Sequence, residues 1–259
     1  MSEIEQERRG RVQILRINRP EARNSLNAAV IAGIGNGVAA ADADPDVRAV
    51  VITATGDKAF CAGMDLRGFA EGRSGIRSEE EEQGLAAYLA FVRSGVSTPV
   101  IGAANATAVA GGFELLLACD MVVASRAAKF GLPEVKRALF AASGGVFLGN
   151  RVPLAVALEL TLTGDNITAE RAFELGLVNR LVDPESVLHE AIALAEAVAA
   201  NGPLAVAVTK RLVRAAAAEP AAEIWALQDE LQPAVFNSVD AKEGATAFVE
   251  RREPVWQGR

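Results

Sequence analysis

The pattern of apolar positions along the chain predicts short strands that alternate with helices. Runs of apolar and β-branched residues between polar loops predict strands at 12–17, 47–53, 98–104, 119–125 and 178–182. Helices are expected at 28–41, 84–95, 153–162 and 168–175, and another begins at the glycine pair 111–112. Ser25 or Asn27 would cap the first of these helices, and Thr168 the last. We expect a surface loop at 68–83, which ends in the acidic run 79–82.

The character of the chain changes at about residue 183. Alanine-rich segments then predict only helices, at 183–200, 203–218, 221–237 and 238–249. The 259 residues suit one large domain, or one domain with a smaller appendage. The pattern therefore indicates an α/β fold of repeated strand–helix units, followed by a helical tail.

Composition and charge exclude several classes of function. The net charge of −7 argues against a nucleic-acid partner, which calls for a basic surface. No apolar run is long enough to span a membrane, and the charged segment 1–11 does not resemble a secretory signal. Cys61 and Cys119 lie in apolar segments and fit free thiols in a reducing compartment, so we expect a cytoplasmic protein.

Two features that could suggest other chemistry do not support it. The single histidine, His189, leaves too few members for a histidine-based metal cluster and no other base for a Ser-His-Asp site. We expect no metal. The glycines at 33, 35 and 37 do not form a dinucleotide fingerprint, because no strand leads into them and the third glycine comes too early.

The stretch from Ala110 to Glu114 allows two interpretations. A helix that begins at Gly111-Gly112 exposes backbone N–H groups and a partial positive charge, and glycine lets a ligand approach them. Glu114 lies one turn on, as a possible acid or base next to this site. The alternative is a structural helix start, in which the glycines serve close packing and Glu114 favours the helix dipole.

Three segments together resemble the crotonase (enoyl-CoA hydratase/isomerase) superfamily. Phe60-Cys61-Ala62-Gly63-Met64-Asp65-Leu66 is similar to its first oxyanion-hole segment, and Gly111-Gly112-Phe113-Glu114 to its second. Phe130-Gly131-Leu132-Pro133-Glu134 is similar to the segment that carries a second glutamate. The loop Asn18-Arg19-Pro20 with Asn24-Ser25-Leu26, the segment 172–179 and the segment 242–248 extend the resemblance over nearly the whole chain.

The resemblance implies a fold of repeated ββα units, with a spiral core at 1–195 and a C-terminal helical oligomerisation region at 196–259. The substrate would be an acyl-CoA, with no separate cofactor because coenzyme A is part of the substrate. The backbone N–H groups of Met64 and Gly111 would stabilise an enolate oxygen. Glu114 would activate water and Glu134 would deliver the α-proton, so one of the two should have a raised pKa.

The resemblance also places the nucleotide and the partner subunits. Ala62, Asp65 and Leu66 would contact coenzyme A, and Arg23 would lie near its phosphates. The helical tail would form the interface of a homo-oligomer, a trimer or a dimer of trimers. Departures from the family pattern are expected to reshape the acyl pocket; they are Ala106, Ala110, Phe113 and Leu139-Phe140.

Both glutamates favour a hydratase that adds water to a 2-enoyl-CoA, as in fatty-acid β-oxidation. A double-bond isomerase of the same fold would need only Glu134, and dehydration of a specialised 3-hydroxyacyl-CoA is a related reaction. The alternative from another class is a non-catalytic protein that binds acyl-CoA.

Overall fold

The computed structural model describes residues 2–72, 75, 78–217, 233, 236–252 and 254. In this part of the chain, a six-stranded sheet has the order β1-β2-β3-β4-β6-β9. Its strands are β1 (Ile4–Arg9), β2 (Val12–Ile17), β3 (Ala49–Ala54), β4 (Val100–Ala104), β6 (Met121–Ser125) and β9 (Arg180–Val182). The pairs from β2 to β9 are parallel, and only β1 runs antiparallel to its neighbour. The five predicted strands are confirmed to within a few residues.

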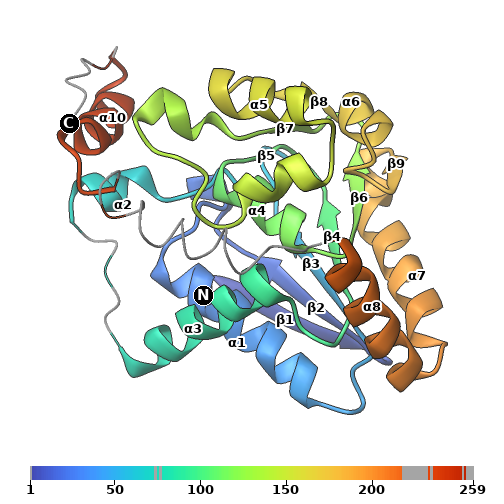
Figure 1. Cartoon of the computed structure of the whole chain (residues 1–259). Coiled ribbons are helices and arrows are strands. Elements are labelled where there is room, and N and C mark those ends of the chain that lie inside the picture. The colour runs from blue at the N-terminus through green and yellow to red at the C-terminus, as the bar shows by residue number, and fades with distance from the viewer. Residues whose placement is uncertain are drawn as a thin grey trace.

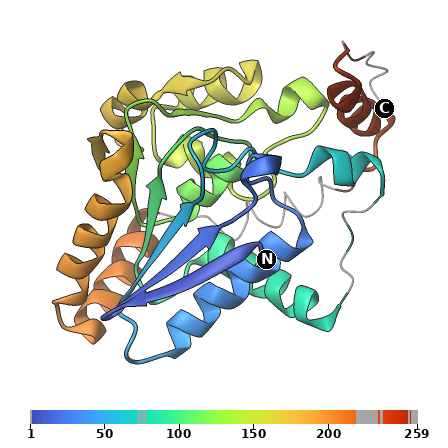
Figure 2. The ribbon, with the colours of Figure 1, turned by 180° about the vertical axis from the view of Figure 1, so that it is seen from behind.

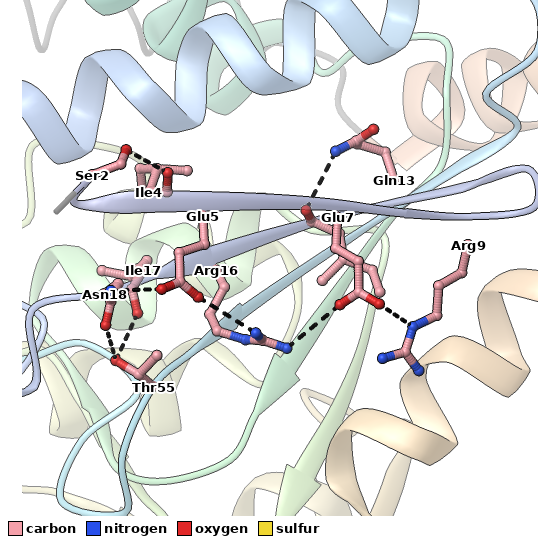
Figure 3. A network of polar contacts seen from close by, with 11 residues as sticks. Ser2, Ile4, Glu5, Glu7, Arg9, Gln13, Arg16, Ile17, Asn18 and Thr55 are labelled. Carbon is pink, nitrogen blue, oxygen red and sulfur yellow. Dashed lines mark hydrogen bonds and ion pairs between the residues drawn. The ribbon is translucent and has the colours of Figure 1, made fainter.

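The edge strand β1 was not expected, because its residues are charged on both faces. Figure 3 shows why it pairs nonetheless: Arg16 on β2 reaches Glu5 at 3.5 Å and Glu7 at 3.9 Å. Glu7 also accepts a hydrogen bond of 2.6 Å from Arg9. Cross-strand ion pairs of this kind replace the apolar alternation that normally identifies a strand.

Helices cover both faces of the sheet (Figures 1 and 2). One face packs on α7 (Val187–Ala199) through a cluster that includes Val51, Ile101 and Ala191. The opposite face packs on α1 (Ala28–Ala43) and α4 (Gly111–Ala118), in the main core. Successive strand residues alternate between the two clusters, as the period of two in a strand requires.

Glycines allow α1 to pack closely on α3 (Glu79–Ser94). A Cβ on Gly35 would meet the backbone N of Tyr88 at 2.6 Å, and one on Gly84 would meet the Cα of Ala32 at 2.5 Å. The glycines that imitate a dinucleotide motif thus serve helix packing. Asn27 caps α1 by accepting from the N–H of Val30, which settles the choice between Ser25 and Asn27.

The helix α3 begins earlier than expected. It starts at Glu79 rather than 84, because Ser78 caps it and the acidic run forms its first turn. Carboxylates in a first turn are favoured by the helix dipole. A short helix, α2 (Leu66–Ala70), also occupies part of the predicted loop.

A smaller sheet, in the order β5-β7-β8, sits beside the main one in the described residues. Its strands are β5 (Ala108–Val109), β7 (Lys129–Gly131) and β8 (Ile167–Thr168). Around it lie the remaining short elements, η1 (Pro20–Ala22), η2 (Pro133–Arg137), η3 (Gly145–Asn150), α5 (Leu154–Thr163), α6 (Ala169–Glu174) and η4 (Pro184–Ser186). Thr168 caps α6, as predicted, and η3 is a 3-10 helix.

The C-terminal helices lie at opposite ends of the molecule. In Figures 1 and 2, α8 (Pro203–Ala217) lies beside α7, whereas α10 (Val239–Glu250) lies beside α2 at the other end. A Cβ on Gly244 of α10 would meet the Cα of Arg137 at 2.8 Å, so α10 also packs closely on the end of η2. The predicted helix at 221–237 falls largely outside the described residues. The division at 195/196 stays a prediction, and its boundary falls within α7.

Candidate active site

Hydrogen bonds and a glycine contact bring the three predicted site segments together. Cys61 bridges to Ala108 of β5, and the N–H of Ala110 donates to the carbonyl of Gly131 at 2.9 Å. A Cβ on Gly112 would lie 2.6 Å from the Cβ of Cys61, so only glycine lets α4 begin this close to the first segment. Close packing of Gly112 is therefore confirmed, and a role of the glycine pair in ligand binding stays a prediction.

The two predicted oxyanion donors lie next to each other. Met64 follows Gly63, and a Cβ on Gly111 would lie 3.8 Å from the Cα of Gly63. Among the described residues, neither the N–H of Met64 nor that of Gly111 donates a hydrogen bond to the protein. Gly111 is the first residue of α4, so its N–H also has the positive end of the helix dipole behind it.

The backbone turns sharply just before α4. Ala110 has φ 53° and ψ −134°, a conformation that L-residues rarely adopt and that glycine adopts freely. This turn connects β5 to α4 and places Gly111 at the N-terminus of the helix. The departure to alanine at 110 therefore strains the backbone rather than altering a contact to the acyl chain.

Glu114 is buried, with 4% of its surface exposed, and is held by backbone donors. Its Oε1 accepts from the N–H of Ser143 at 2.7 Å and from that of Gly145 at 2.9 Å. Its Oε2 lies 3.9 Å from where a Cβ on Gly111 would be, so the carboxyl group faces the oxyanion donors. Burial raises the pKa of Glu114 to about 7, although the two hydrogen bonds oppose this shift.

Glu134 is placed by Pro133 at the start of η2. Its Oε2 is buried and has no hydrogen-bond partner in the described part of the chain. Burial, and then the charge of Glu114, raise the pKa of Glu134 to about 8. The two glutamates are therefore electrostatically coupled, and a raised pKa, expected for one of them, is found for both.

The predicted coenzyme A residues cluster on the outer side of the first segment. The N–H of Ala62 donates to the carbonyl of Arg23 at 3.1 Å, and Arg23 itself is exposed. Asp65 caps α2 by accepting from Gly68 at 3.1 Å, and Leu66 is the first residue of that helix. These contacts give Asp65 a structural role, and its part in binding stays a prediction.

The loop at 18–26 holds the site in a way that sequence reasoning missed. The buried Asn24 side chain donates to the carbonyls of Thr55 and Ala59, at 2.9 and 2.8 Å. Arg19 donates to the carbonyl of Ser25 at 2.8 Å and reaches Asp65 at 3.4 Å. The signal that could have revealed these hydrogen bonds is the run of polar residues in a tight loop that returns toward a strand.

The bulky departures from the family pattern do not reshape the cavity next to Glu114. This cavity, of about 680 Å³, begins at Glu114 and Ser143, and none of the predicted departures lines it. Phe113 is buried and packs on Phe130, with ring centroids 5.5 Å apart, and Phe140 packs on Phe236. Phe113 thus packs in the core and does not line this cavity, whereas Glu114 does, and an effect of Phe113 on the acyl pocket stays a prediction.

No three His, Cys, Asp or Glu side chains of the described part of the chain lie close enough together to hold a metal ion. No helix within it is long and apolar enough to cross a membrane.

Comparisons with known proteins agree with this geometry. The family model for enoyl-CoA hydratase/isomerase matches residues 7–259. The chain is 38% identical over 255 residues to the enoyl-CoA hydratase EchA19 of Mycobacterium tuberculosis, covering 98% of this chain and 96% of the relative. It is 36% identical over 257 residues to the carnitinyl-CoA dehydratase of Proteus mirabilis, with 97% of each covered.

Solved structures extend the agreement to the fold. The crystal structure of a carnitinyl-CoA hydratase from Mycobacterium avium has a TM-score of 0.90 and 43% identity, with 100% of both chains covered. An enoyl-CoA hydratase/isomerase from Pseudoalteromonas atlantica has a TM-score of 0.87 and 31% identity, covering 98% of this chain and 100% of that one. The chain therefore has the crotonase fold and belongs to the enoyl-CoA hydratase/isomerase family.

Proposed function

We propose that the protein is an enoyl-CoA hydratase, which reversibly adds water to a 2-trans-enoyl-CoA to give a 3-hydroxyacyl-CoA. The observation that carries the proposal is the contrast between its two coupled glutamates. Two backbone donors favour the ionised form of Glu114, whereas Oε2 of Glu134 has no hydrogen-bond partner among the described residues and the pKa of Glu134 is the higher. One base and one acid in a shared buried site are what addition of water across a double bond requires.

In the proposed reaction, the thioester oxygen accepts hydrogen bonds from the N–H groups of Met64 and Gly111. The carboxylate of Glu114 takes a proton from water as its oxygen bonds to the β-carbon, and an enolate forms. Glu134 then gives its proton to the α-carbon. Each oxyanion donor contributes about 3 kcal/mol of transition-state stabilisation, by analogy with measured donors in other enzymes. In reverse, the same steps dehydrate a 3-hydroxyacyl-CoA, the type of reaction that the name carnitinyl-CoA dehydratase describes for a relative.

The substrate's nucleotide part would bind where the resemblance places it, along Ala62, Asp65 and Leu66 with Arg23 near the phosphates. No separate cofactor takes part. The buried free thiols of Cys61 and Cys119 support a reducing, cytoplasmic location. A place in fatty-acid β-oxidation follows from the reaction type and is part of the proposal.

Self-association is also part of the proposal. The helix α5 exposes Leu154, Leu158 and Leu162 at 65%, 45% and 69%, and this i, i+4 spacing forms one apolar stripe. A trimer or a dimer of trimers would cover it. Sedimentation at several concentrations tests this, with Leu158→Glu expected to lower the molecular mass; a wild-type monomer would contradict the proposal.

The activity test follows loss of the conjugated enoyl thioester of crotonyl-CoA and of longer 2-enoyl-CoAs. We expect Glu114→Gln and Glu134→Gln each to lower kcat/KM by about 10²- to 10⁴-fold. Glu159→Gln, at an exposed position on α5, serves as the matched control. Circular dichroism and melting temperatures establish that each variant is folded.

The rival functions predict different results. Wild-type turnover that survives both substitutions would sink the mechanism. Conversion of a 3-enoyl-CoA that survives loss of Glu114 would identify an isomerase. Binding of an acyl-CoA by calorimetry, without turnover of any enoyl-CoA, would identify a carrier.

A further inference from the structure

The cavity that begins at Glu114 runs along α4 toward its C-terminal end. It is lined by Glu114, Leu117, Ala118, Cys119 and Asp120 in turn. Other lining residues come from the end of α3, from η3, from α7 and from α8; α3, α4, α7 and α8 are labelled in Figure 1. Glu114 would face the β-carbon of the substrate in the proposed reaction. Groups beyond that carbon therefore enter this cavity.

The middle of the cavity is apolar and suits a methylene chain. Apolar residues that line the cavity include Val92, Leu117, Phe147, Leu148, Val206 and Val213. The helical distance from Glu114 to Ala118 is about 6 Å, at a rise of 1.5 Å per residue. A chain of about five carbons beyond the β-carbon would span it.

The far end of the cavity is basic. Among the described lining residues, Arg151, Lys210 and Arg214 lie near the C-terminal end of α4, where Asp120 also lines the cavity. Lys210 reaches Asp120 at 2.7 Å, and Arg214 reaches it at 2.8 Å. Two cations thus share a single acidic partner.

Arg151 has no carboxylate partner among the described residues. Its guanidinium donates to the carbonyl of Leu117 at 2.6 Å, near the negative end of the α4 dipole. Arg214 likewise donates to the carbonyl of Ala118 at 2.9 Å. The backbone carbonyls supply only partial negative charge, so among the described residues this end of the cavity has more cationic than anionic side chains.

Lys210 is largely buried, with 10% of its side chain exposed, whereas Arg151 and Arg214 are more exposed. Burial, and then the charge of Arg214, lower the pKa of Arg151, although its side chain remains accessible from the cavity. Burial also lowers the pKa of Lys210, although the charge of Asp120 acts to raise it. A nearby Asp42 accepts instead from Ser97 and from the N–H of Thr98, each at 2.7 Å. An added anion would relieve this repulsion.

We propose that the cavity binds the distal part of the acyl chain, and that its basic end selects chains that terminate in a carboxylate. The preferred substrate class is then an ω-carboxy-2-enoyl-CoA of medium length. The inference rests on the proposed function, because it uses Glu114 to place the β-carbon. The new element of the proposal is an ion pair between the guanidinium of Arg151 and the substrate's terminal carboxylate.

The test compares pairs of substrates of equal length. We expect kcat/KM for 2-octenedioyl-CoA to exceed that for 2-octenoyl-CoA about 10- to 100-fold, the value of one charge-assisted hydrogen bond. The six-carbon and ten-carbon pairs should show smaller ratios. A 2-enoyl-CoA whose chain ends in a quaternary ammonium should be the poorest of the eight-carbon substrates.

The variant Arg151→Gln keeps the length of the side chain and removes its charge. We expect it to reduce the ratio between the two eight-carbon substrates to about 1–5. The control is Arg126→Gln, whose partner Asp183 lies 3.9 Å away on the surface and whose loss should leave the ratio unchanged. Lys210 and Arg214 are less suitable targets, because both also anchor α8 to Asp120.

Binding measurements keep this inference separate from the hydratase proposal. Calorimetry with saturated octanedioyl-CoA and octanoyl-CoA measures the same preference without turnover. Equal affinities for the pair, or an unchanged ratio in Arg151→Gln, would overturn the proposed selectivity. A clear preference in binding without hydration would support it while overturning the hydratase function.

Discussion

Glu114 and Glu134 are electrostatically coupled but differ in their hydrogen bonds. The first carboxyl group accepts from two backbone N–H groups, and Oε2 of the second has no donor in the described part of the chain. Their pKa values of about 7 and about 8 follow this difference. Between these values, an ionised Glu114 and a protonated Glu134 coexist.

The pH dependence of activity should therefore be bell-shaped. We expect kcat/KM for crotonyl-CoA to be highest between pH about 7 and about 8. Activity falls at lower pH as Glu114 gains a proton, and at higher pH as Glu134 loses one. Initial rates from pH 5 to 10 measure this, and a flat profile across that range would contradict the assignment.

Stability should fall with rising pH because both folded-state pKa values are raised. The contribution of Glu134 is fully present below its unfolded pKa of 4.5 and is lost as pH rises through about 8. At about 1.36 kcal/mol per unit, this shift bounds the loss at about 5 kcal/mol. Glu134→Gln should thus have a higher melting temperature than wild type at pH 9, and a smaller difference at pH 5. The same comparison with Glu159→Gln should show no pH-dependent difference.

Gly112 should tolerate no side chain. A methyl group there would press on the backbone of Cys61, so Gly112→Ala is expected to cost about 1–3 kcal/mol of unfolding free energy. Moving α4 also displaces the N–H of Gly111, and kcat should fall by about 100-fold. Gly202→Ala is the control, because a Cβ there has no neighbour within 4 Å. Equal stability and activity of the two variants, by denaturant unfolding and crotonyl-CoA assay, would refute the packing argument.

Ala110→Gly should stabilise the protein. Relief of the strained φ of 53° contributes about 1–3 kcal/mol, and the added freedom of glycine in the unfolded chain offsets about 0.5–1 kcal/mol. Ala106→Gly, at a buried alanine without a positive φ, should destabilise instead. Urea unfolding of both variants checks the opposite signs, and a loss of stability in Ala110→Gly would show that the turn is not strained.

Tyr88→Phe should leave the fold intact and raise its stability by about 1 kcal/mol. The hydroxyl of Tyr88 is buried and has no hydrogen-bond partner in the described residues, so its removal ends a desolvation cost. Thermal unfolding at pH 7 measures the change. A marked decrease in stability would mean that this hydroxyl has a partner.

The strands of the main sheet from β2 to β9 were predictable because each is a local pattern. Apolar β-branched runs identified β2, β3, β4, β6 and β9, and the glycine pair marked the start of α4. The edge strand β1 was missed because it is mostly charged and buries only Ile4 in the main core, although its backbone pairs with β2 along its whole length. The start of α3 was misplaced, although Ser78 and the acidic first turn carried the signal.

The site was predictable as far as its motifs reach. The roles of Ser143 and Gly145 were not, because they concern backbone N–H groups that approach Glu114 only in the folded chain. The available signal was the glycine-rich stretch around Ser143 and Gly145, which can begin a helix. The exposed N–H groups at a helix start bind anions such as the carboxylate of Glu114. The direction of Phe113 also depends on tertiary packing, because neighbouring residues on one helix face different surroundings.

The position of α10 has a consequence for the synthesis of the protein. This helix, at 239–250, packs beside α2, which follows the first oxyanion segment, and on η2, which carries Glu134. Both of these elements precede it by more than a hundred residues. The segments that carry the candidate chemistry can therefore complete their packing only after α10 has been synthesised. A chain that ends before α10 would form the sheet but would lack the contacts of α10 with α2 and η2.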